Sequence, residues 1–180
     1  MSALLMQGVV LIGQSYLAPE PGYRVAEFLS EYTQIGAFDV REDRVYIQDG
    51  DTIHLVNAKT GEALRKYGEP ADYQVANYAS FLTISPDEKT IWVGYTSDGN
   101  AADRIYSIDM ESGLWTLKAK FPGNYDLIFW RDSILVSGLN SATWGDPNGI
   151  YLLDTSGMDQ HRLIVEVGGN SAGMAIDSLE

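Results

Sequence analysis

The sequence predicts an all-β fold built from one unit that recurs about every 46 residues. Three markers recur together: a glycine-closed turn after a pair of apolar residues, a short β-rich run upstream of that turn, and an asparagine that opens the next unit. The asparagines are Asn77, Asn124 and Asn170. Three independent markers with one period indicate a repeat architecture, so the units are considered before any single motif.

The glycine-closed turn occurs in three copies, at residues 55–61 (LVNAKTG), 107–113 (SIDMESG) and 152–157 (LLDTSG). We interpret each copy as the end of a strand, where an Asn or Asp side chain caps a tight turn that glycine closes. A β-branched or aromatic run precedes each copy, and another predicted strand follows it.

The β-rich runs lie at residues 45–47, 91–93 and 134–136, each set off by a polar turn. Each unit therefore contains four short strands, which is the pattern of a β-propeller blade. For the middle unit we predict strands over residues 79–84, 91–95, 104–109 and 115–121. We read residues 67–78 as a connecting loop, because Gly68 and Pro70 interrupt them.

The count of strands predicts a partial ring, with three full blades and strands of a fourth. We place the blades at about residues 34–68, 77–122 and 124–168, within a propeller region over 23–180, and another blade begins at 170. Residues 1–22 form a hydrophobic stretch with a Pro/Gly break, either the remnant of a signal or a closing strand. A closed four-bladed ring is the alternative, with residues 9–17 and 23–29 completing the fourth blade.

Two short motifs carry a resemblance to a known family. Residues 85–89 (SPDEK) are similar to an SPDGK turn, and residues 92–95 (WVGY) stand where YVTN is found. Residues 56–61 match a VDxxTG turn, so the region 35–177 resembles the YVTN-type, or surface-layer-like, repeat β-propellers. Glu88 departs from that pattern by replacing the turn glycine. The resemblance implies a periplasmic, cell-surface or secreted protein, and a function as a scaffold, binding module or lactonase.

Charge and composition exclude several classes of function. The chain has 25 acidic and 12 basic residues, a net charge of −13, so it repels phosphate backbones and we expect no nucleic-acid partner. It has no cysteine, which excludes disulfides, thiolate metal sites and cysteine nucleophiles. The apolar residues 3–13 are too few to span a bilayer as a helix, so no stable membrane span is expected.

The predicted ligand site lies at one end of the central channel, where loops that lead into inner strands meet loops that join second and third strands. An acidic, amide-rich funnel with tyrosines suits a hard cation, a sugar or a basic peptide. Asn or Asp before a strand also commonly caps a turn, which is the structural alternative. The candidate residues are Asn77, Tyr78, Asn124, Tyr125, Asp126, Trp144, Asn170 and Ser171. Trp144 either stacks on a sugar or partner, or covers the edge of a blade.

Two loops at the same end are candidates for calcium. One supplies Asp98, Asn100 and Asp103, and the other supplies Asp146 and Asn148. Neither matches the twelve-residue calcium loop, and a hard cation needs six to eight oxygens, so either loop would need help from a neighbour.

Catalytic motifs are mostly missing from the sequence. His54 and His161 fall on a predicted third and a predicted fourth strand, and no nucleophile elbow or phosphate loop occurs. We therefore expect a non-enzymatic binding or scaffold module with a protein, carbohydrate or small polar partner. The alternatives are a hydrolase or lactonase with a divalent metal at the channel mouth, and a gene fragment of a larger propeller. Homodimerisation or further C-terminal blades would complete a partial ring.

Overall fold

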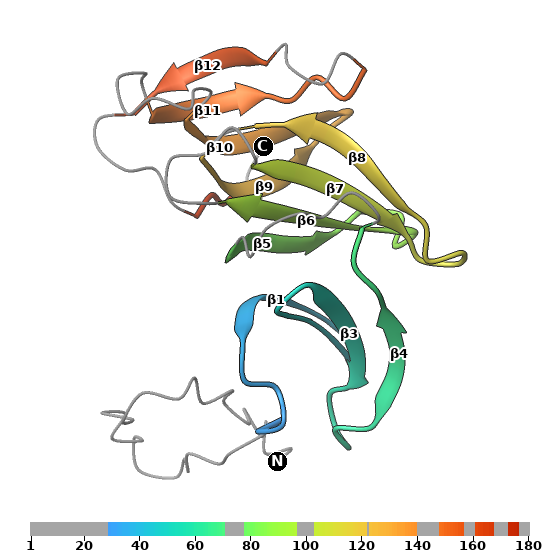
Figure 1. Cartoon of the computed structure of the whole chain (residues 1–180). Helices are drawn as coiled ribbons and strands as arrows, with labels where there is room; N and C mark the ends of the chain where they lie inside the picture. The colour runs from blue at the N-terminus through green and yellow to red at the C-terminus, as the bar shows by residue number, and fades with distance from the viewer. Residues whose placement is uncertain are drawn as a thin grey trace, which may run out of the picture.

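The fold is a set of three antiparallel β-sheets that follow one another along the chain (Figure 1). The computed structural model describes residues 29–70, 78–96, 103–121, 123–139, 148–156, 161–167 and 173–176. These residues form twelve strands and no helix. None of them belongs to a helix long and apolar enough to cross a membrane.

In each sheet the four strands lie in the order in which they occur in the sequence, and each strand pairs antiparallel with its neighbours. The first sheet contains β1 (Ile35–Arg41), β2 (Arg44–Asp49), β3 (Thr52–Asn57) and β4 (Ala63–Tyr67). The second contains β5 (Tyr78–Ile84), β6 (Thr90–Thr96), β7 (Arg104–Asp109) and β8 (Trp115–Lys120). The third contains β9 (Asn124–Trp130), β10 (Ser133–Leu139), β11 (Asn148–Leu152) and β12 (Arg162–Glu166).

This arrangement confirms the predicted fold class, a partial β-propeller with three four-stranded antiparallel blades. In the middle blade each predicted strand lies within one residue of the observed strand at both ends. The predicted fourth blade is described only at residues 173–176, and the predicted N-terminal stretch, 1–22, lies outside the described residues. The predicted closing strands over 9–17 and 23–29 also lie there, apart from Leu29.

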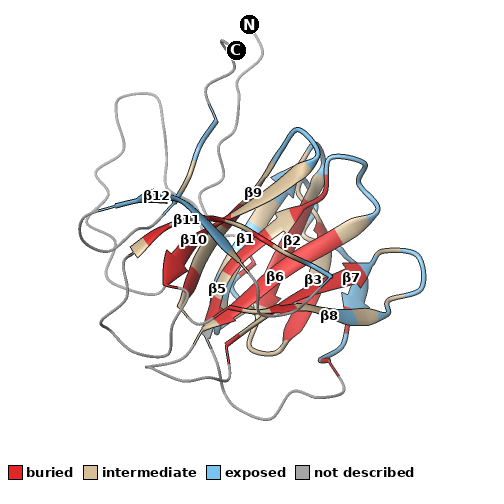
Figure 2. Cartoon of the chain, turned by 90° about the horizontal axis from the view of Figure 1, so that it is seen from above, coloured by how far each residue is buried: buried red, intermediate tan, exposed pale blue. Residues whose placement is uncertain are grey.

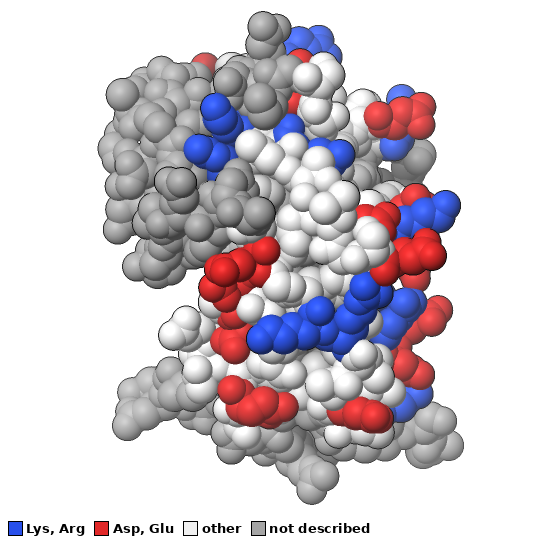
Figure 3. All heavy atoms as spheres, turned by 45° about the vertical axis from the view of Figure 1, so that its right-hand side comes forward, with Lys and Arg blue, Asp and Glu red and all other residues white. Residues whose placement is uncertain are grey.

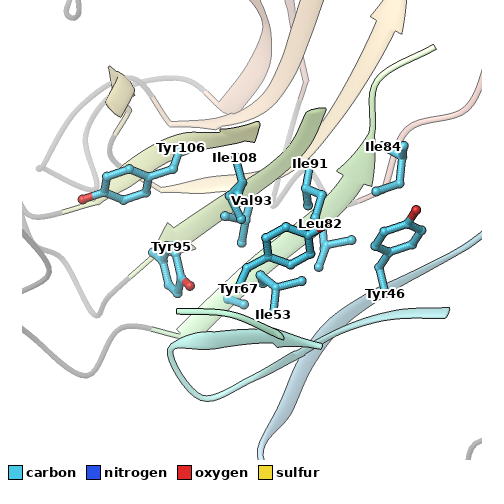
Figure 4. Close-up of a cluster of buried hydrophobic side chains, with 11 residues drawn as sticks. Tyr46, Ile53, Tyr67, Leu82, Ile84, Ile91, Val93, Tyr95, Tyr106 and Ile108 are labelled. Atoms are coloured by element: carbon cyan, nitrogen blue, oxygen red, sulfur yellow. The ribbon is translucent and has the colours of Figure 1, made fainter. Parts of the chain in front are cut away.

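The core forms between successive sheets, because their middle strands are apolar on both faces. On β2, Tyr46 packs toward the second sheet (Figure 4), while Val45 and Ile47 belong to a separate cluster with Leu29. Successive strand residues point to opposite faces, so one strand contributes to two apolar layers. A further cluster joins the second and third sheets around Phe121 and Leu127. Figure 2 accordingly shows the middle strands mostly buried and the outer strand β12 exposed.

Two of the three capped turns predicted from the sequence are described in full and are confirmed, while Gly157 of the third lies outside the described residues. The Asn57 side-chain oxygen accepts the amide N–H of Lys59 at 2.8 Å, and Gly61 closes the turn at φ 74°. In the second sheet Asp109 accepts the amide of Ser112 at 2.7 Å. A left-handed glycine at the end of each of these turns avoids the Cβ clash that other residues would meet.

Polar contacts also join the sheets to one another. On the first sheet, Asp39 accepts the Ile84 amide of β5 at 3.0 Å, and Arg44 pairs with Glu88 of the second sheet at 2.7 Å. The contact of Asp39 has a counterpart in the third sheet, where Asp126 accepts the Met174 amide at 2.6 Å. Residues 173–176 therefore lie beside β9 as β5 lies beside β1. In Figure 3 the molecule is turned so that the side of Figure 1 on which β4 lies comes forward. This view shows a band of basic side chains bordered by acidic ones.

Candidate functional site

In all three sheets, the chain enters the inner strand at the same end. The loop that joins the second strand to the third lies at this end as well. The strand registers define it, because Ile35 pairs with Asp49, Tyr78 with Thr96, and Asn124 with Gly138. We call this end the loop end. The opposite end carries the turn between β1 and β2, the turn between β3 and β4, and the equivalent turns of the other sheets, and we call it the turn end. The loop end is where the sequence predicts the ligand site.

Seven of the predicted site residues lie outside the described residues: Asn77, Asp98, Asn100, Trp144, Asp146, Asn170 and Ser171. Tyr78 begins β5 at the loop end. The side chains that can be followed are those of Asn124, Tyr125, Asp126, Asp103 and Asn148, and all five residues lie at or next to the loop end.

Asn124 is completely buried and its amide is used inside the protein. Its Nδ2 donates to the backbone oxygens of Tyr95 at 3.0 Å and Phe121 at 2.9 Å, and its Oδ1 accepts the hydroxyl of Ser80. These bonds join the second and third sheets. A buried amide with this many internal partners acts as a structural link, so we leave Asn124 out of the surface that meets a ligand.

Asp103, a predicted metal ligand, is also buried and hydrogen-bonded within the protein. Its Oδ2 accepts the hydroxyl of Thr96 at 2.9 Å and the amide of Gly123 at 2.7 Å. Burial raises the pKa of Tyr125, and the charge of Asp103 raises it further, so Tyr125 faces this carboxylate as a neutral phenol at neutral pH.

The two remaining predicted residues differ in their contacts. Asp126 accepts its neighbour Leu127's amide at 2.8 Å in addition to the amide of Met174. Asn148 pairs with Leu139, and its buried Oδ1 has no hydrogen-bond partner. Across the described ranges, no three His, Cys, Asp or Glu side chains are grouped closely enough to hold a metal ion.

The loop end of the first sheet also carries acidic residues, of which Glu69 was not predicted from the sequence. Asp49 and Asp51 flank the turn at Gly50, and Glu69 follows β4. A hydrogen bond to Asp51, together with its negative charge, raises the pKa of Glu69. Two acidic residues around a glycine turn can be seen in the sequence, whereas the proximity of Glu69 to Asp51 depends on how β4 returns along β3.

A histidine and a tyrosine lie next to these carboxylates. The rings of Tyr32 and His54 meet edge to face with centroids 4.8 Å apart. Burial lowers the pKa of His54 and the charge of Lys66 lowers it further, while Asp49 opposes both effects. His54 is therefore a neutral ring at neutral pH, packed against Tyr32 beside the acidic residues.

The described ion pairs are not at this end of the sheets. Asp39–Arg41, Arg44–Glu88 and Lys59–Asp43 all lie toward the turn end. Within the described ranges, Asp49, Asp51 and Glu69 have no ion-pair partner. Among the residues that the structure describes, the negative charge at the loop end of the first sheet is thus not neutralised by an ion pair.

Comparisons with known proteins identify the fold but no closer relationship. No protein-family model matches the chain, and no curated protein matches it. Hydrazine synthase of Kuenenia stuttgartiensis matches 75% of the chain with a TM-score of 0.55 and 18% identity, over 44% of its own length. The tricorn protease matches 73% of the chain with a TM-score of 0.51 and 16% identity, over 13% of its own length. Both are propeller-type proteins, so the chain is similar to part of a propeller and spans less than half of either structure.

Proposed function

We propose that this chain is a non-enzymatic binding module of the β-propeller type, and that its loop end holds a positively charged segment of a partner protein. The observation that carries the proposal is the placement of Asp49, Asp51 and Glu69 at the loop end of the first sheet, where β4 returns beside β3 and brings Glu69 next to Asp51. The repulsion between these two carboxylates decreases when a cation binds between or beside them. A lysine or arginine side chain supplies that cation and donates charge-assisted hydrogen bonds to carboxylate oxygens.

The rest of the loop end suits the same partner. Asp49 lies across the turn from Asp51, and Tyr32 and His54 add an aromatic surface next to them. Aromatic faces attract guanidinium and ammonium groups, which supports a basic peptide over a neutral sugar. The net charge of −13 also attracts basic partners from a distance and speeds their association.

A binding role also agrees with how the buried polar groups are used. Asn124 and Asp103 hold neighbouring segments together through internal hydrogen bonds. Such residues give a rigid scaffold, on which exposed groups at the loop end meet a partner. A location outside the cytoplasm is part of this proposal and rests on the resemblance of the turn motifs to surface-layer-like propellers.

The experiment compares two double variants that remove the same charge from opposite ends. Asp51→Asn with Glu69→Gln neutralises the loop end, and Glu42→Gln with Asp43→Asn neutralises the turn end. The probe is a short synthetic peptide of alternating arginine and glycine, measured by isothermal titration calorimetry at low and at high salt. We expect the loop-end variant to lose about tenfold in affinity, which is about 1.4 kcal/mol. We expect the turn-end variant to bind nearly as well as the original chain.

Equal losses in the two variants would show that only net charge matters and would overturn the proposal. Calcium and a neutral oligosaccharide provide further comparisons. A rise in melting temperature with calcium that Asp103→Asn abolishes would favour the metal site and the hydrolase alternative instead. Binding of the oligosaccharide without binding of the peptide would favour a carbohydrate ligand.

A further inference from the structure

The outer strand of the third sheet is an exposed apolar edge. β12 is the end strand in the order β12-β11-β10-β9 (Figure 1), and every residue of it is exposed. Leu163, Ile164 and Val165 are 39%, 45% and 48% exposed and follow one another without an intervening polar residue. An edge strand presents unpaired backbone N–H and C=O groups, and a charge usually keeps other strands away.

The outer strands of the other two sheets carry that protection. β4 has the sequence ALRKY and β8 has WTLKAK, so each contains basic residues in its middle. The comparison is sharpest between β8 and β12, which carry a β-bulge at the same place, whereas the bulge of β4 lies two residues further along its neighbour β3. The register skips Lys118 in β8 and Ile164 in β12, opposite equivalent positions of the neighbouring strand. Where the second sheet places a lysine, the third sheet places an isoleucine.

The charges at the two ends of β12 are complementary to each other. The strand reads Arg-Leu-Ile-Val-Glu, with Arg162 at its start and Glu166 at its end. In an antiparallel pair of two such strands centred on Ile164, Arg162 of each strand comes level with Glu166 of the other, and the apolar residues come together between them. A parallel pair would instead bring like charges level with each other, which destabilises strand pairing.

From these observations we infer that β12 pairs antiparallel with β12 of a second copy of this chain. The pairing joins two four-stranded sheets into one continuous sheet across a two-fold axis. It covers the exposed Leu163, Ile164 and Val165 and forms the Arg162–Glu166 pair twice. An interface of this symmetry uses the same surface on both copies, so it closes at a dimer and does not extend into a fibre.

The first test measures the mass of the whole chain by sedimentation equilibrium over a wide range of concentration. We expect a monomer–dimer equilibrium, and Ile164→Lys should shift it to monomer by restoring the charge found at Lys118. Leu64→Lys is the matched control, because Leu64 is the exposed residue that the register skips in β4. We expect this control to dimerise as the original chain does. A chain that is monomeric throughout, or equal behaviour of the two lysine variants, would overturn the inference.

The second test reverses the charges. Arg162→Glu places two carboxylates level with each other, and we expect it to weaken dimerisation at least tenfold. The double variant Arg162→Glu with Glu166→Arg recreates the opposite-charge pairing and should restore the dimer. Failure of the double variant to restore it, with an unchanged circular dichroism spectrum, would overturn the antiparallel register. Neither variant changes Asp49, Asp51 or Glu69 on the first sheet, so peptide binding and dimerisation can fail independently.

Discussion

The hydroxyl of Ser80 on β5 donates a hydrogen bond to the side-chain oxygen of Asn124 on β9, so a single buried amide joins the second and third sheets at the loop end. The same amide donates to the backbone oxygens of Tyr95 and Phe121. Asn124 therefore connects the end of β6, the end of the second sheet and the inner strand of the third. It holds two neighbouring blades together at the loop end.

Replacing Asn124 with alanine should destabilise the protein by about 1–3 kcal/mol, because two buried carbonyl oxygens lose their donor. Ser80→Ala should cost less, since it leaves the two bonds donated by Asn124 in place. The free energy of unfolding from chemical denaturation measures both effects, and the double variant measures their coupling. Glu111→Ala, on an exposed turn, is the control. A change in Asn124→Ala no larger than in this control would contradict the structural role.

Replacing Asp126 with alanine should expose the backbone amide of Met174 to faster hydrogen exchange. The amide donates to Asp126 at 2.6 Å, and this bond holds residues 173–176 beside β9. Asp126→Asn keeps an acceptor oxygen and should preserve much of the protection. Exchange followed by NMR at Met174 tests both variants. Unchanged exchange in Asp126→Ala would show that another contact fixes this segment.

Substitutions at two turn residues with positive φ, Gly113 and Glu42, should change the stability of the protein in opposite directions. Gly113 has φ 76°, so Gly113→Ala should cost about 1 kcal/mol. Glu42 has φ 52° although it is not glycine, and Glu42→Gly should therefore stabilise the protein by about 0.5 kcal/mol. A Cβ added at Gly68 would meet no other part of the protein within 4 Å, and Gly68 lies outside the left-handed region, so Gly68→Ala is the neutral control. Thermal denaturation that ranks these variants in another order would contradict the turn geometry.

The core tyrosines should make the protein less stable at alkaline pH. Burial raises the pKa of Tyr46 and of Tyr67 above the ordinary value of 10.0. The folded state thus favours the neutral phenols, and this contribution to stability is complete below pH 10 and is lost as the pH rises through the folded-state pKa values. Tyr46→Phe should show a shallower loss of unfolding free energy above pH 10 than the original chain. Identical slopes would indicate that Tyr46 is accessible to solvent when ionised.

Local sequence patterns were sufficient to predict the blades. Runs such as residues 91–93 alternate between two apolar layers, and in the turn at Asn57 the side chain accepts backbone amides only two and three residues away. Interactions over such short distances along the chain act the same way in every copy of a repeat. This explains why the predicted strand limits of the second sheet agree so closely with the observed ones. Glu88 has φ 54°, the left-handed conformation that glycine adopts most readily, at the turn position where the resembling SPDGK motif has glycine.

The candidate site was predicted less completely, because its chemistry depends on contacts between distant parts of the chain. The sequence could place Asn124, Asp103 and Asp126 at one end of the blades, but only the packing decided that their side chains hold neighbouring segments together. The pairing of β4 with its neighbour β3 likewise brought Glu69 to Asp51. Periodicity determines which end of a strand a polar residue occupies. Whether that residue meets solvent or another backbone is set by the adjoining blade, whose position no single repeat encodes.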